Sequence, residues 1–158
     1  MNDAQSLKWI PERARRIAAD DVVSDGNWSL EQVCEHLALA IEATLSREDS
    51  GSEEPRLPFS KRWRRLKQYF MKRGLLLTGR LPKNVPAPEF VVPSSAPSLV
   101  ATLIRLETAV EAFERAIERS NGPWPAHPML GRMSGAEWRR FHWIHASHHY
   151  SLFRRSAK

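Results

Sequence analysis

The sequence predicts an all-α protein: a four-helix bundle with a long Pro-rich crossover and an accessory basic helix. Apolar residues recur every three or four positions in four separate stretches, which is the period of amphipathic helices. We find no stretch in which apolar and polar residues alternate as in a strand. A chain of 158 residues fits a single domain, which we expect to span residues 1–158.

The first helix is expected over about residues 3–19. Pro11 is tolerated only in the first turn of a helix, so the helix starts or kinks there. Its core-facing residues would be Leu7, Ile10, Ala14 and Ile17. The polar segment that follows, up to Gly26, has the composition of a turn.

The second helix is expected to end near Ser46, with Asn27 or Ser29 as its N-cap. Ser29 and Gln32 have the spacing of a capping box. The predicted apolar stripe consists of Leu30, Val33, Leu37, Ile41, Thr44 and Leu45. Cys34 is expected to be a small buried residue, and as the single cysteine it cannot form an intrachain disulfide.

The accessory basic helix lies in residues 56–83, which contain 10 Lys and Arg and no acidic residue. Its aromatic and aliphatic residues are expected to face the core while the cations stay in water, and Gly74 is expected to break it. The predicted inward stripe is Phe59, Trp63, Leu66, Phe70 and Leu77. Five prolines between Gly79 and Pro97 then predict an extended crossover, which would allow the flanking main helices to run parallel.

The third main helix is expected to begin after Ser98 and to stop at Asn121-Gly122-Pro123. Its predicted seam is Leu99, Leu103, Leu106, Val110, Phe113 and Ile117. The last helix begins after Ser134, which can form a capping box with Glu137. Its inward stripe would be Trp138, Phe141, His145, one of His148 or His149, and Leu152. Trp28 and Trp138 are expected to pack in the core beneath the helix starts.

Four of the six histidines lie in this last helix. His145 and His149 are four residues apart, which places both imidazoles on one face of a helix. Such a pair can bind a metal ion together, or it can be two ordinary helix residues, one of them bonded to a carbonyl. We expect His142 and His148 to flank the site or face solvent, and His127 to be structural.

Three groups of residues resemble the DinB-like four-helix-bundle superfamily. They are residues 27–30 with Gln32 and 36–38, residues 145–149, and the connector 127–131 with Ser134, Glu137 and Trp138. The connector is similar to that of one uncharacterised bacterial branch of the superfamily. The resemblance spans nearly the whole chain, although each motif is short.

The resemblance implies a divalent metal ion, zinc or nickel, held by His36, His145 and His149, with His148 as the alternative to His149. It also implies a metal-dependent transferase of small thiols or a hydrolase, acting on a small-molecule substrate. The chain departs from the superfamily pattern after the last ligand, where it has Tyr150-Ser151-Leu152 in place of a basic residue, glycine and glutamine. This departure leaves the substrate chemistry open.

Two other functions remain open from the sequence. The basic segment 56–83 could bind nucleic acid or another polyanion without any catalysis, or the bundle could be a metal-free dimeric scaffold. The chain has no Gly-rich phosphate loop, no nucleophile elbow and no CxxC motif. With no apolar run long enough to span a bilayer, we expect a cytoplasmic protein without a membrane partner.

Overall fold

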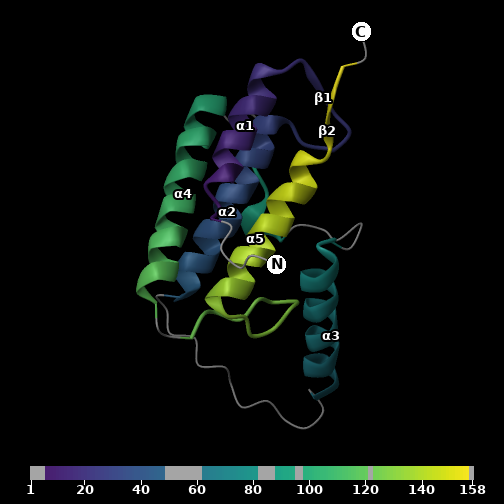
Figure 1. Cartoon of the computed structure of the whole chain (residues 1–158), viewed down its shortest axis with the longest axis vertical. Helices are drawn as coiled ribbons and strands as arrows, with labels where there is room; N and C mark the ends of the chain where they lie inside the picture. The colour runs from purple at the N-terminus through teal and green to yellow at the C-terminus, as the bar shows by residue number, and fades with distance from the viewer. Residues whose placement is uncertain (1–5, 49–61, 82–87, 95–97, 121–122, 157–158) are drawn as a thin grey trace.

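The computed structural model describes residues 6–48, 62–81, 88–94, 98–120 and 123–156 (Figure 1). Within these ranges the chain is mainly helical, with five α-helices and a small two-stranded sheet. The helices are α1 (Trp9–Ala19), α2 (Leu30–Glu48), α3 (Arg62–Thr78), α4 (Leu99–Arg119) and α5 (Gly135–Tyr150). The strands are β1 (Val22–Ser24) and β2 (Phe153–Arg155), and a 3-10 turn, η2, covers Glu89–Val91.

Four of the helices, α1, α2, α4 and α5, pack around one core, and α3 stands at the side of α5 (Figure 1). The longest shared interface joins α2 and α4, whose C-terminal ends both lie at the lower end of the view. They therefore run parallel, as the long crossover between them allows. The largest fully buried side chains include Leu7, Ile10, Ile41, Leu106, Phe113 and Ile144.

The predicted apolar stripes of α1, α2 and α4 are confirmed in the core, with Leu45, Leu99, Leu103 and Ile117 only partly buried. Both predicted capping boxes are also present. In α2 the Ser29 N–H donates to Gln32 Oε1 at 3.0 Å, and the Gln32 N–H donates to Ser29 Oγ at 3.4 Å. In α5 the same exchange joins Ser134 and Glu137. The local sequence therefore sets where α2 and α5 begin. These two helices contain His36, His145 and His149.

The two-stranded sheet was not predicted. β1 and β2 pair antiparallel, with Val22 opposite Arg155 and Ser24 opposite Phe153. Each strand has three residues, which is too short to produce a recognisable alternation. Leu152, expected on the inward stripe of the last helix, lies beyond the end of α5 and next to β2.

The predicted orientation of the basic helix was wrong. Trp63, Leu66, Phe70 and Leu77 are exposed, and Leu75 is the buried leucine of α3. Phe59 lies outside the described residues. Gly74 does not break α3, because a single helical glycine costs only about 1 kcal/mol relative to alanine. No helix in the described ranges is both long and apolar enough to cross a membrane.

Candidate metal centre

Three histidines from two helices converge beside the core. His36 projects from the second turn of α2, and His145 and His149 project from successive turns of α5. One ring nitrogen from each lies within 4.8 Å of the other two. His145 Nε2 is 3.0 Å from His36 Nε2 and 3.2 Å from His149 Nε2. The group could hold a metal ion.

The tautomer of His36 follows from its second ring nitrogen. His36 Nδ1 lies 2.7 Å from the carbonyl oxygen of Val91 in η2. A carbonyl only accepts hydrogen bonds, so Nδ1 must carry the proton and donate it. Nε2 of His36 therefore has a free lone pair, and this lone pair faces His145. A metal-binding imidazole commonly has this arrangement, with its other nitrogen donating to a carbonyl.

The segment that carries Val91 is tied to α2 by side chains next to His36. Glu35 Oε2 accepts hydrogen bonds from both the N–H and the hydroxyl of Ser94, each at 2.8 Å. Gln32 Nε2 donates to the Ser94 carbonyl at 3.2 Å. These three bonds hold the end of the crossover against α2, and so they fix the carbonyl that orients His36.

Burial keeps the three imidazoles neutral. It lowers the pKa of His36, and it lowers the pKa of His149 to about 3, with smaller contributions from His36 and His148. Burial also holds the pKa of His145 well below its ordinary value, and the neighbouring imidazoles lower it further. A metal ion requires its histidine ligands in this neutral form.

The cluster does not satisfy its own hydrogen-bonding groups. His145 Nδ1 is buried without a partner. If His145 Nε2 carries the proton, it can donate to only one of the two nitrogens it faces. If Nδ1 carries it, the lone pairs of His36 Nε2 and His145 Nε2 face each other at 3.0 Å, and only His149 can donate to His145 Nε2. Two nitrogens bound to a tetrahedral zinc ion are about 3.3 Å apart, which is close to the observed 3.0 and 3.2 Å. The residues present therefore fit a divalent metal ion.

Trp28 covers the cluster from the chain just before α2. Its ring lies 4.6 Å from that of His36 and stacks on that of His149 at 5.7 Å, with planes 20° apart. Trp28 packs against the core as expected, but it is only half-buried and also covers the histidine cluster. Val91 and Glu35 are further site residues that sequence reasoning missed, because their roles depend on a contact between α2 and the crossover.

The remaining histidines have other environments. His148 is half-buried beside His149 and is not a member of the three-residue group. His127 Nδ1 accepts the N–H groups of Met129 and Leu130 at 3.1 and 3.2 Å, which agrees with the structural role expected for it. Cys34 is fully buried, and burial raises its pKa to about 12, so its thiol stays protonated.

His142 lies next to His145, which agrees with the expectation that it flanks the site and corrects the alternative that it faces solvent. It does not face solvent but is buried in the core, with Nε2 3.2 Å from Thr44 Oγ1 and its ring stacked on Trp138. Burial lowers its pKa to about 3. The reason is its position three residues before His145, which returns it to the same inward face of α5.

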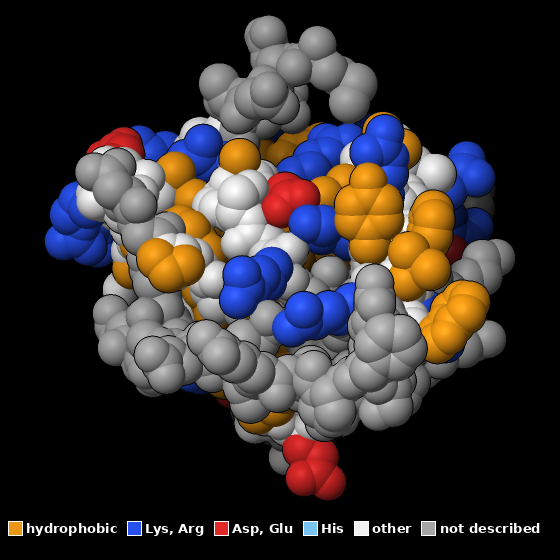
Figure 2. All heavy atoms as spheres, turned by 90° about the horizontal axis from the view of Figure 1, so that it is seen from below, with side chains coloured by type: hydrophobic (Ala, Val, Ile, Leu, Met, Phe, Trp, Pro, Cys, Tyr) orange, Lys and Arg blue, Asp and Glu red, His pale blue; other side chains and the backbone are white. Residues whose placement is uncertain are grey.

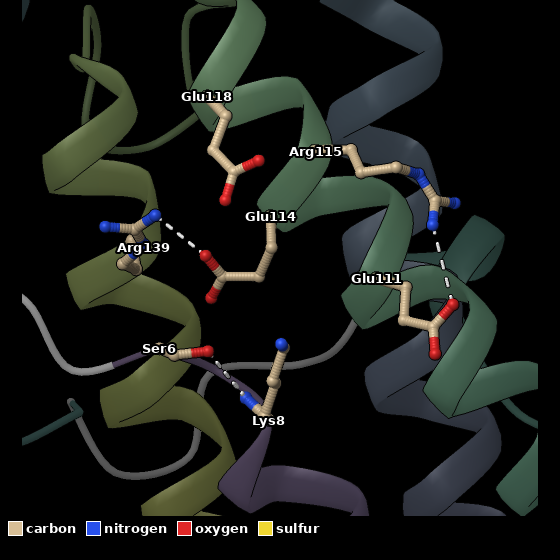
Figure 3. A pocket seen from close by; sticks show the side chains of 7 residues that line it. All are labelled: Ser6, Lys8, Glu111, Glu114, Arg115, Glu118 and Arg139. Atoms are coloured by element: carbon tan, nitrogen blue, oxygen red, sulfur yellow. Dashed lines mark hydrogen bonds and ion pairs between the residues drawn. The ribbon is translucent and has the colours of Figure 1, made fainter.

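A second polar cluster lies at the other end of α5, where a pocket of about 500 Å³ opens between α1, α4 and α5 (Figure 3). Glu114 is buried there; it accepts the Leu7 N–H at 2.5 Å and pairs with Arg139 at 2.7 Å. Arg115 pairs with Glu111 at 3.5 Å in the same view. The pocket is lined by Ser6, Lys8, Glu111, Glu114, Arg115, Glu118 and Arg139. Its buried carboxylate is thus neutralised from within the protein.

Comparison with known proteins identifies a family but no activity. No curated protein and no solved structure matches the chain significantly. A family model described as "Protein of unknown function (DUF1569)" matches residues 3–156, which is almost the full length and includes all three converging histidines. The chain therefore belongs to the DUF1569 family.

Proposed function

We propose that His36, His145 and His149 bind one divalent metal ion, zinc or nickel, in a DinB-like four-helix bundle. The observation that carries the proposal is the convergence of their Nε2 atoms, together with the bond that makes the His36 lone pair available. The parallel α2 and α4 and the long crossover support the DinB-like arrangement. We assign the ligand role to His149 rather than to His148, because His149 belongs to the converging group.

The proposed activity is a metal-dependent transfer of a small thiol or hydrolysis of a small molecule. A metal ion with three protein ligands and open positions supplies a Lewis acid and a means of activating water. In the protein, the Val91 carbonyl holds the His36 ring in one orientation. His145 and His149 are only partly buried, so the substrate would approach from their side. The half-buried indole of Trp28 would provide an apolar wall for it.

The test is elemental analysis of protein purified without a histidine tag. We expect about one equivalent of zinc or nickel per chain, retained through gel filtration. If the protein contains no metal, and also fails to bind zinc added after treatment with a chelator, the proposal is wrong. A metal-free scaffold would then be the better description of the bundle.

A further inference from the structure

We propose that the outer face of α3 docks on an anionic phospholipid surface, although the sequence alone led us to expect no membrane partner. This face consists of Trp63, Leu66, Phe70 and Leu77, which are 79%, 45%, 63% and 66% exposed. At about 100° per residue they fall within an arc of about 60° and extend over about 20 Å of helix. The proposal concerns a different surface from the histidine cluster and does not depend on a bound metal.

The opposite side of α3 is the side that packs on the rest of the protein. Gln68 Nε2 donates to the Pro128 carbonyl at 3.1 Å, and Lys72 Nζ donates to the Arg132 carbonyl at 2.9 Å. Lys72 also pairs with Glu137 of α5 at 2.8 Å, and Leu75 is buried. The apolar outer face is therefore held outward by fixed contacts and is not an undocked core face.

The charge around this face selects the kind of partner. Residues 62–78 contain six Lys and Arg and no Asp or Glu, and of these cations Lys72 lies on the packed side. Lys67 and Arg73 are exposed on the two flanks of the apolar arc. Figure 2 shows the lower end of the molecule, where hydrophobic and basic side chains lie next to one another. An apolar face bordered by cations is the pattern of a helix that lies in the interface of an anionic membrane.

Other occupants fit the face less well. Single-stranded nucleic acids bind by stacking their bases on aromatic rings. Leu66 and Leu77 cannot stack on a base, so half of the exposed apolar face would not contribute to such binding. A second copy of the same face would bring cations against cations with no acidic residue on the helix to neutralise them. A lipid surface uses the leucines, the aromatic rings and the cations together.

The experiment is co-sedimentation of the full chain with vesicles. The test vesicles contain equal parts of phosphatidylcholine and phosphatidylglycerol, and the reference vesicles contain phosphatidylcholine alone. We expect binding to the anionic vesicles and little binding to the neutral ones. The charge reversal Lys67→Glu/Arg73→Glu should weaken anionic binding at least tenfold, because each cation near such a surface contributes about a fivefold effect. Trp63→Ser/Phe70→Ser should weaken it similarly.

Matched variants elsewhere control for apolarity and charge. Val100→Ser/Ile104→Ser removes two apolar residues of α4 that are 68% and 59% exposed, and should bind like the wild type. Arg13→Glu/Arg16→Glu makes the same change in net charge on α1 and should have a smaller effect than the α3 pair. If Trp63 enters the lipid surface, the tryptophan fluorescence of the wild type should shift to the blue when anionic vesicles are added. Trp63→Phe should still bind the vesicles but lose most of this shift. Circular dichroism establishes that each variant is folded.

Three outcomes would overturn the proposal. The first is equal binding to neutral and anionic vesicles, or to neither. The second is wild-type binding by both α3 variants. The third is tighter binding to single-stranded DNA than to the vesicles, or dimerisation that Trp63→Ser/Phe70→Ser abolishes, since either result would assign the face to another partner.

Discussion

Two polar clusters lie near the two ends of α5, and they differ in whether their members carry opposite charges. Near its start, Arg139 faces the buried Glu114, which also accepts the Leu7 N–H, so opposite charges and a hydrogen-bond donor meet. Near its end, His145 and His149 face His36, so three groups of the same kind meet. The charges of the first cluster cancel, although Arg139 Nε is buried without a partner, whereas the second cluster has no opposite charge and leaves His145 Nδ1 without a partner.

The difference in charge bears on whether each cluster would gain from a bound cation. A buried ion pair neutralises its own charges, joins helices together and needs no added ion. A group of neutral imidazoles has no opposite charge among its own members, and a cation bound to their ring nitrogens would satisfy them together, as we propose for this cluster. The predictions that follow separate these two behaviours, beginning with the largest expected effect.

Replacing a proposed ligand should nearly abolish metal binding. Mutating a residue that only orients a metal ligand typically lowers metal affinity about 10–100-fold. For His36→Ala, His145→Ala or His149→Ala, which each remove a proposed ligand, we expect a larger loss. Zinc titration followed by calorimetry measures it. His127→Ala and His148→Ala are the controls and should retain one equivalent. A normal affinity in His149→Ala together with loss in His148→Ala would exchange the assignment of these two residues.

Breaking the ion pair should affect stability and leave metal binding unchanged. Glu114→Ala removes the partner of Arg139 and the acceptor of the Leu7 N–H. We expect a loss of about 2–3 kcal/mol in the free energy of unfolding, below the value for fully buried pairs because Arg139 keeps some solvent contact. Urea denaturation measures this loss. A drop in zinc content in the folded variant would show that the two clusters are coupled.

The crossover contact should tune the metal affinity without supplying a ligand. Glu35→Ala removes two of the three bonds that hold Ser94 and so loosens the segment whose carbonyl orients His36. We expect about 10–100-fold weaker zinc binding in a folded protein. Glu42→Ala is the matched control. Like Glu35, Glu42 contacts Arg105, but it has no bond to Ser94. Equal zinc affinity in the two variants would contradict the orienting role.

The metal-free protein should lose stability as the pH falls below about 6.5. The pKa values of the three histidines are lowered in the folded state, to about 3 for His149. As the pH falls, the unfolded chain therefore takes up protons at a higher pH than the folded protein does. Each extra proton on the unfolded chain lowers the free energy of unfolding by about 1.4 kcal/mol per pH unit. The loss should continue toward pH 3, and His149→Leu should make the dependence shallower. Denaturation midpoints measured across this range, with and without zinc, test it, and an unchanged slope in His149→Leu would mean that His149 ionises freely in the folded protein.

Local features of the sequence predicted a large part of the fold and of the site. The capping boxes at Ser29 and Ser134 and the apolar stripes depend on residues within a turn or two of each other, and they are observed. The spacing of His145 and His149 likewise places them on one face of a helix whatever surrounds it. His36 entered through resemblance to a superfamily, because nothing in the local sequence of α2 indicates what it faces.

Other features were decided only when distant segments met. The strands β1 and β2 bring the segment between α1 and α2 together with the segment after α5, and three-residue strands have no pattern of their own. The outward turn of Trp63 and Phe70 depends on the connector at Pro128, which offers α3 polar contacts for its other face. The tautomer of His36 depends on the Val91 carbonyl, which Glu35 holds through Ser94. Periodicity and capping act over a few residues, but a hydrogen bond between α2 and the crossover exists only after loop closure has brought both into place.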